Sequence, residues 1–214
     1  MKAILYKQFH LVCHPMTLVF LLFGVMLLIP SYPYTVIFFY VMLGLFFSFV
    51  NGREQKDIYY SALLPIRKRD TVKASVVFVL VIELASLLIS IPFAVLSVSV
   101  NPLGGNAVGM EPNAFLFAAA LVLYALFNGI FLPEFYKTAY KVGVSFLKAV
   151  IPAAFVMLGL ELTVHVPSLV WLEDCTPAGQ LRLLPLVLCA AVIYGVGLWL
   201  TYQKAAKNYE KVDL

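Results

Sequence analysis

Two glutamates inside long apolar runs are the residues whose position most suggests chemistry. Glu83 lies in the first half of the run Ala74–Val100, and Glu161 lies near the end of the run Val142–Val164. An ionisable group is expensive inside a membrane, so a carboxylate there is a candidate for gating, substrate contact or pairing between helices. The alternatives are a carboxylate that reaches the membrane surface for Glu83 and an interfacial residue for Glu161.

No other arrangement of reactive side chains resembles a catalytic centre. Glu161 precedes His165 by one helical turn, and such a pair could titrate near neutral pH. The histidines are scattered, and no pair of aspartates lies inside an apolar run, which argues against an intramembrane protease. Cys13, Cys175 and Cys189 have no paired spacing, which argues against a disulfide or a metal site. We therefore predict no catalytic residue and no metal ligand.

The most polar stretch is the segment 51–73, which holds six of the fifteen Lys and Arg residues. Leu64-Pro65 divides this segment, because proline disfavours helix at the residue before it and suits the start of a new helix. We predict a short helix over Glu54–Leu63, then a turn, then a helix that starts near Ile66 and runs into the next apolar run.

The short helix has an amphipathic pattern. Its apolar stripe comprises Ile58, Tyr59, Ala62 and Leu63, and its polar residues, expected in water, are Arg53, Glu54, Lys56 and Asp57. Such a helix could rest on lipid headgroups, with Arg67–Arg69 binding anionic lipid, could dock a soluble protein, or could be a plain loop. The shorter segment Pro133–Lys141 is either a turn between helices or a second contact for the same partner. The residues for that contact would be Glu134, Tyr136 and Lys137.

Composition indicates a membrane protein. The chain is 63% hydrophobic and 12% charged, with a mean hydropathy of +0.95, whereas soluble domains are about 45–50% apolar and about 25% charged. A membrane-spanning helix needs roughly 20 apolar residues. Six runs are candidates: Pro15–Ile29, which is short, Tyr34–Val50, Ala74–Val100, Asn113–Leu132, Val142–Val164 and Leu183–Tyr202. We predict an all-α, polytopic protein with six transmembrane helices in a single domain, residues 1–214.

Basic residues are confined to alternate connecting segments. Of the fifteen Lys and Arg residues, all but Arg182 lie in the segments 1–14, 51–73, 133–141 with the start of the next helix, and 203–214. Because positively charged segments stay in the cytoplasm, we predict that both termini, the 51–73 loop and the 203–214 tail are cytoplasmic. The net charge of +4 then reflects membrane topology, and no motif for nucleic-acid binding accompanies it.

The N-terminal residues Met1–His14 are predicted to form an amphipathic helix in the membrane interface. The residues expected to face lipid are Ile4, Leu5, Phe9, Leu11 and Val12, and those expected to face water are Lys2, Lys7 and Gln8. A cleaved signal peptide is not expected, because no small-residue cleavage site follows the first apolar run.

The six-span topology, the amphipathic N-terminus and one sequence pattern together point to a known family. The pattern follows the second span and reads Glu54, then Leu63-Leu64-Pro65-Ile66, then basic residues, Asp70 and Val72-Lys73-Ala74. With these features the chain resembles the permeases of the ABC-2 transporter family. More narrowly, it is similar to the small bacterial permeases that include the phenol-soluble modulin exporter, although its first span is short.

The resemblance implies a permease subunit of an ATP-driven ABC exporter in the bacterial cell membrane. Its substrate would be an amphipathic peptide of the phenol-soluble modulin or antimicrobial type. ATP and Mg²⁺ would bind to a separate ABC ATPase, since this chain has no G-x-x-x-x-G-K-[ST] motif and needs no cofactor of its own. The permease would pair with a second copy or a similar permease. The coupling helix would contact the ATPase through Glu54, Lys56, Asp57, Ile58, Tyr59, Ala62, Leu63 and Leu64.

Two other classes of protein share parts of this pattern. A membrane sensor or assembly protein would use the 51–73 loop to recruit a cytoplasmic partner without transporting anything. A secondary transporter driven by an ion gradient would need midplane charges and broken helices in two matching halves. Glu83 is the single midplane candidate, and no matching halves are evident.

Overall fold

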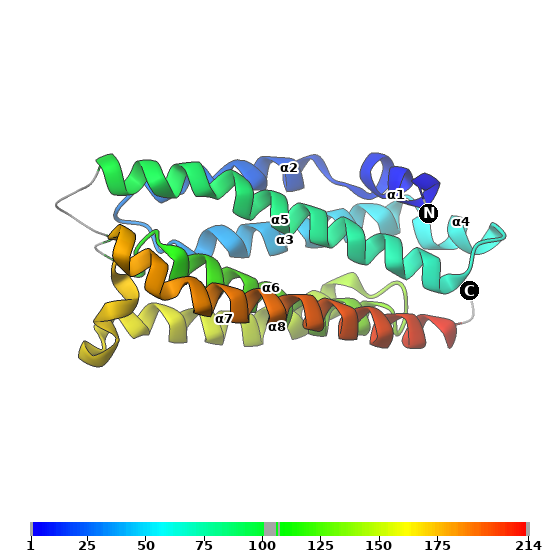
Figure 1. Cartoon of the computed structure of the whole chain (residues 1–214). Helices are drawn as coiled ribbons and strands as arrows, with labels where there is room; N and C mark the ends of the chain where they lie inside the picture. The colour runs from blue at the N-terminus through cyan, green and yellow to red at the C-terminus, as the bar shows by residue number, and fades with distance from the viewer. Residues whose placement is uncertain (1, 101–105, 107, 213–214) are drawn as a thin grey trace.

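The structure is a computed structural model that describes residues 2–100, 106 and 108–212. This part of the chain is 84% helical and contains no strand, so the all-α prediction is confirmed. Its long helices run side by side along one axis (Figure 1). The predicted single domain, residues 1–214, extends at both ends beyond the described residues.

Within the described residues, five helices are long and apolar enough to cross a membrane. They are α3 (Thr35–Glu54), α5 (Lys68–Val100), α6 (Ala114–Phe135), α7 (Val142–Leu162) and α8 (Pro177–Glu210). The shorter elements are α1 (Lys2–Lys7), η1 (Gln8–Val12), α2 (Pro15–Leu21), η2 (Leu22–Leu28), α4 (Asp57–Leu63), η3 (Thr163–His165) and η4 (Pro167–Glu173). With 33 and 34 residues, α5 and α8 are each about 50 Å long, so both exceed the roughly 30 Å hydrocarbon core of a bilayer.

The first predicted span is the exception among the six. It is present as α2 and η2, which meet the length and hydropathy requirement only together with the preceding helix Lys2–Val12. That helix is bent from Pro15–Leu28 by 90°. The break has a local cause, because Pro15 takes the first position of α2 and the His14 side chain accepts a hydrogen bond from the N–H of Met16 at 3.1 Å.

Both chain ends and α4 lie at one end of the bundle, and η3 and η4 lie at the other (Figure 1). We name these the inner end and the outer end. A hydrogen bond at 2.6 Å from the Lys68 ammonium to the Val212 carbonyl joins the start of α5 to the chain after α8. The segments that carry the basic residues therefore share one end of the molecule, as the charge pattern predicts.

The centre of the bundle is α6, which packs against α3, α7 and α8. Its side chains Tyr124, Phe127 and Phe131 are fully buried, and Phe127 and Phe131 stack with ring centroids 5.1 Å apart. A helix that is apolar on all sides is buried on all sides, which explains its central position.

The N-terminal helix differs from the expectation for a helix with one wet face. Gln8 is 2% exposed and donates a hydrogen bond to Ser75 Oγ at 3.2 Å, so the prediction that Gln8 faces water is wrong. Ile4 and Val12 are also buried rather than turned to lipid. The reason is tertiary, because α1 and η1 pack against α3 and α5.

Candidate functional site

The helix α4 turns its polar residues inward and its apolar residues outward. Asp57 and Ser61 are 4% and 3% exposed, whereas Tyr59, Tyr60 and Leu63 are 56%, 55% and 72% exposed. Contiguous apolar surface that carries no covering element marks an interaction site for protein or membrane. The prediction that Asp57 stays in water is therefore wrong, and the apolar stripe is the free face of the helix.

The inward face of α4 is fastened to the N-terminal helix by Lys7. The Lys7 ammonium lies 2.5 Å from Asp57 Oδ1 and donates a hydrogen bond to Ser61 Oγ at 2.5 Å. The Lys7 and Asp57 side chains are 17% and 6% exposed. Burial of a charge is tolerated when the charge is paired and hydrogen-bonded, so Lys7 explains why the polar side of this helix is the covered one.

The helix α4 begins three residues later than predicted, because Lys56 adopts a left-handed conformation with φ 52° and ψ 33°. This conformation is uncommon for a residue other than glycine, and it separates α3 from α4. Glu54 consequently closes α3 instead of opening the short helix. Lys56 and Glu54 remain exposed on either side of the break.

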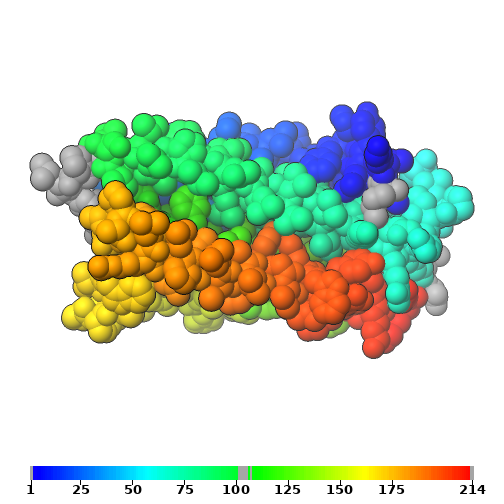
Figure 2. Space-filling view, in the orientation of Figure 1, coloured from blue at the N-terminus to red at the C-terminus, as the bar shows by residue number. Residues whose placement is uncertain are grey.

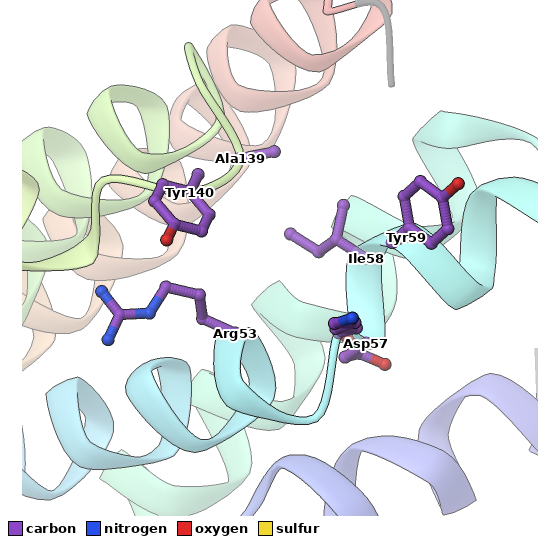
Figure 3. A pocket seen from close by; sticks show the side chains of 7 residues that line it. Arg53, Asp57, Ile58, Tyr59, Ala139 and Tyr140 are labelled. Atoms are coloured by element: carbon purple, nitrogen blue, oxygen red, sulfur yellow. The ribbon is translucent and has the colours of Figure 1, made fainter.

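A pocket of about 390 Å³ lies between the start of α4 and the loop that joins α6 to α7. Ile58 points toward Ala139 and Tyr140 on that loop, and Arg53 extends toward the Tyr140 ring (Figure 3). The Arg53 guanidinium carbon lies 5.5 Å from the centre of that ring, within the range of a cation–π contact. The α6–α7 loop and α4 thus form one continuous surface at the inner end.

The predicted second contact is only partly available at the surface. Tyr136 is 1% exposed and donates a hydrogen bond to Ser75 Oγ at 2.8 Å, so it braces α5 and does not offer a contact to a partner. Burial raises the pKa of its hydroxyl. Glu134 forms ion pairs with Lys137 and Lys148, and of the three predicted residues Lys137 is the most exposed.

Of the coupling residues predicted from the sequence, those on the outward face of α4 are brought together. Tyr59, Ala62, Leu63 and Leu64 are exposed there, and Ile58 lines the pocket beside them. Sequence reasoning missed Lys7 and Tyr140, which complete the site from distant segments. In the sequence, Lys7 stands among apolar residues and Tyr140 stands beside Lys141, and both features could have drawn attention to them. Neither feature indicates which residue the side chain contacts.

The comparisons with known proteins decide the family. The model of the ABC-2 family transporter proteins matches residues 3–210. This chain belongs to the ABC-2 family. It is therefore a multi-pass membrane protein of a transport system whose members work with an ABC ATPase. No curated protein and no solved structure gives a significant match.

In this ABC-2 protein, Glu83 is fully buried at the junction of α5, α6 and α8. Both of its carboxylate oxygens lie 2.9 Å from Asn128 Nδ2, and Oε2 also accepts a hydrogen bond from the Tyr194 hydroxyl at 2.6 Å. The sequence marked Glu83 as a candidate for gating or pairing. In the structure Glu83 of α5 is hydrogen-bonded to Asn128 of α6 and Tyr194 of α8, and its carboxylate has no exposed surface.

Glu161 takes part in a brace at the outer end of the ABC-2 bundle. Its Oε1 accepts hydrogen bonds from the Thr35 hydroxyl at 2.6 Å and the Thr35 N–H at 3.3 Å, and its Oε2 accepts one from the N–H of Met110 at 3.0 Å. Both oxygens are therefore engaged with α3 and the segment before α6, not with His165. Within the described residues, no group of three or more His, Cys, Asp or Glu side chains is arranged to hold a metal ion.

Proposed function

We propose that this protein is the permease subunit of an ATP-driven exporter and that α4 is the helix through which its ABC ATPase acts. The observation that carries the proposal is the outward apolar face of α4, with Tyr59, Tyr60 and Leu63 more than half exposed at the extreme inner end. Figure 2 shows the residues of α4, in cyan, at the tip of the molecule. Family membership supplies the class of partner.

Force applied to α4 has direct routes into the membrane helices. Toward the N-terminus, two residues separate α4 from α3; toward the C-terminus, four residues separate it from α5. The pair between Lys7 and Asp57 adds a third route into α1. A push on Tyr59 and Leu63 would therefore reach three helices at once, which is the requirement for converting movement of an ATPase into movement of a bundle.

Charged residues surround the apolar part of the same site. Arg53 and Lys56 border the pocket, while Glu54 is exposed at the end of α3. A partner that places an apolar or aromatic side chain in the pocket and an acidic group beside Arg53 and Lys56 would match this surface. Lys137 on the second loop would extend the positive rim.

The rest of the working assembly follows from this assignment. The inner end would face the cytoplasm of a bacterial cell membrane, the helix Lys2–Val12 would lie in the interface, and a second permease would complete the pathway. ATP and Mg²⁺ would bind to the ATPase. The substrate class we favour is the amphipathic peptide, because the membrane helices offer abundant apolar surface and few charges. Peptides of the phenol-soluble modulin or antimicrobial type are the leading candidates.

The test is co-purification of the chain with an ABC ATPase from the same organism. We expect Leu63→Asp to abolish the complex, because it places a charge at the most exposed large side chain of the apolar face. The matched control is Val108→Asp, which changes a 47% exposed apolar residue near the outer end and is expected to leave the complex intact. A complex that survives Leu63→Asp and also Tyr59→Asp would contradict the role of α4.

A transport assay separates the two parts of the proposal. Proteoliposomes that hold the complete complex would be tested for ATP-dependent movement of a fluorescent amphipathic helical peptide and of a hydrophilic peptide of the same length. We expect movement of the amphipathic peptide alone. Equal movement of both, with the complex intact, would reject the substrate class and retain the coupling surface.

A further inference from the structure

The buried hydrogen bond between Glu83 and Tyr194 lies at the interface between α5 and α8, which we call the seam. Polar contacts join the two helices along only part of this seam. The two helices run side by side on one face of the molecule (Figure 2). At the inner end they are joined by the Arg69–Glu210 ion pair, whose closest N–O distance is 2.5 Å. At mid-height the connection is the Tyr194 hydroxyl on Glu83 Oε2.

Above this level, toward the outer end, the seam gives way to an apolar pocket of about 450 Å³. Its lining includes Ile91 and Val95 of α5, Phe117 of α6 and Gln180 of α8. None of the described hydrogen bonds or ion pairs joins α5 to α8 at this height. Glu83 and Tyr194 are therefore the last polar connection before the pocket.

On its other side α5 is held closely by η2 at Ser90, about two helical turns from Glu83 toward the outer end. A Cβ atom added to Gly24 of η2 would lie 3.0 Å from the Cα of Ser90 and 2.7 Å from its Oγ. Real Cβ contacts are not that short, so η2 and α5 approach here through glycine alone. With η2 on one side and Tyr194 on the other, the stretch Glu83–Ser90 is the part of α5 fixed from both sides.

The partners of Glu83 are neutral hydrogen-bond donors, the Asn128 amide and the Tyr194 hydroxyl, and not cations. No Lys, Arg or His forms an ion pair with Glu83 in the described part of the chain. Asn128 is fully buried, and its Oδ1 has no hydrogen-bond partner. Asn128 Nδ2 now faces both Glu83 oxygens. Once the Asn128 amide has turned over, a glutamine in place of Glu83 could accept from Tyr194 and donate to Asn128 Oδ1, so the site can hold a neutral side chain of the same shape.

We propose that Glu83 is a positioning residue of the permease, which pins α5 to α8 through Tyr194 and thereby sets how far the apolar pocket toward the outer end opens. Glu83 thus acts through helix position and does not touch substrate. The inference concerns the bundle alone, so it stands or fails independently of the coupling surface on α4.

Cys175 is a natural reporter for this pocket, because it is one of the lining residues and is half-buried. Burial, reinforced by the charges of Glu111, Glu173 and Asp174, raises the pKa of its thiol to about 12. The thiolate is the reactive form, so Cys175 is expected to react slowly with a water-soluble maleimide while the seam is closed. Separation of α5 from α8 would expose the thiol and increase the rate.

The experiment measures this rate in the full chain with Cys13→Ser and Cys189→Ser, purified in detergent. Tyr194→Phe removes the pin and is expected to raise the rate about tenfold, the effect of losing one hydrogen bond to a carboxylate. The matched control is Tyr124→Phe, which removes another buried hydroxyl, one that pairs with Ser86 Oγ at 2.9 Å and joins α5 to α6. The control is expected to change the rate less than about twofold.

Substitutions of Glu83 itself test whether the hydrogen bonds of this side chain or only its size keeps α5 and α8 together. Glu83→Gln is expected to keep the wild-type rate, and Glu83→Leu is expected to match Tyr194→Phe. An unchanged rate in Tyr194→Phe would overturn the proposal. So would an equal increase in Tyr124→Phe, because that result would indicate general loosening; thermal denaturation of both variants supplies the comparison of overall stability.

Discussion

The inner and outer ends of this ABC-2 protein are held together by different chemistry. At the inner end, ion pairs join separate elements, among them Lys7 with Asp57 and Arg69 with Glu210. At the outer end, carboxylates accept hydrogen bonds from the backbone: Glu161 from Thr35 and Met110, and Glu173 from Glu111. No ion pair lies at the outer end in the described part of the chain.

This difference has a mechanical meaning. The exposed ion pairs of the inner end, such as Arg69 with Glu210, contribute little net stability and can exchange a partner for water, so the elements that they join can shift relative to one another. The pair of Lys7 with Asp57 is buried and is the exception. A carboxylate that holds backbone N–H groups fixes the path of the chain, because each released donor would need a new acceptor. The end that we propose to receive the ATPase is therefore the adaptable one, and the opposite end is braced.

The largest expected effect comes from breaking the one well-buried pair of the inner end. Lys7→Met leaves Asp57 buried without a counter-charge, and we expect a loss of about 3 kcal/mol of stability together with release of α1 from α4. Thermal denaturation in detergent measures the first effect, and protease sensitivity of the N-terminal segment measures the second. Lys2→Met, which changes an exposed lysine of the same helix, is the control, and an equal loss in both variants would refute the special role of Lys7.

A smaller effect is expected from weakening the brace of the outer end. Glu161→Gln keeps one acceptor oxygen but turns an NH₂ group toward the donors of Thr35 or Met110. The expected loss is about 1–2 kcal/mol, visible as a lower midpoint of thermal unfolding. Asp174→Asn keeps the acceptor that serves the Thr176 N–H at 2.8 Å and should change the midpoint less. The opposite order would show that Glu161 is not part of a brace.

The smallest effect is a pH dependence at the outer end. Burial raises the pKa of Glu173; the Glu111 N–H opposes this, and the charges of Glu111 and Glu161 raise it further. The folded state therefore holds this proton more tightly than the unfolded state, so its contribution to stability is present at low pH and is lost as pH rises from about 4.3 through the folded pKa. In Glu173→Gln the side chain is neutral at every pH tested, so the variant mimics the protonated carboxyl group and does not titrate.

The measurement is the unfolding midpoint of Glu173→Gln and wild type from pH 4 to pH 7. The two proteins should be equally stable at the acid end, and the variant should be the more stable at pH 7. A variant that is less stable at pH 7 would show that the carboxylate is needed in its charged form as an acceptor for the Glu111 N–H.

The positions of the long helices were largely predictable, because hydropathy is a local property. The predicted runs correspond to α3, α5, α6, α7 and α8, although several of these helices extend beyond the apolar residues. The first run was the weakest prediction: it is short, and the bend at Pro15 divides it from the preceding helix. The polar first turns of α5 were predicted from Leu64-Pro65, which placed a helix start near Ile66. The polar turns at both ends of α8 were not predicted, because a hydropathy window does not distinguish a polar helix from a polar loop.

The candidate site was predictable in its location but not in its orientation. Leu64-Pro65 correctly separated α4 from α5, and the apolar stripe on α4 was correctly recognised. The side of the helix that faces water was predicted wrongly for Asp57, because amphipathic patterns are usually taken to place charges outside. Tyr136 was predicted to contact a partner, yet its hydroxyl is used inside the bundle.

Composition, charge and proline act over a few neighbouring residues, so they were sufficient to predict a helical membrane protein with its basic segments at one end and a short helix after the second apolar run. Which face of that helix is free depends instead on contacts between distant segments. Lys7 reaches Ser61 across 54 residues, and Asn128 and Tyr194 reach Glu83 across 45 and 111 residues. Such partners are chosen when helices pack, and no local pattern in the chain specifies them.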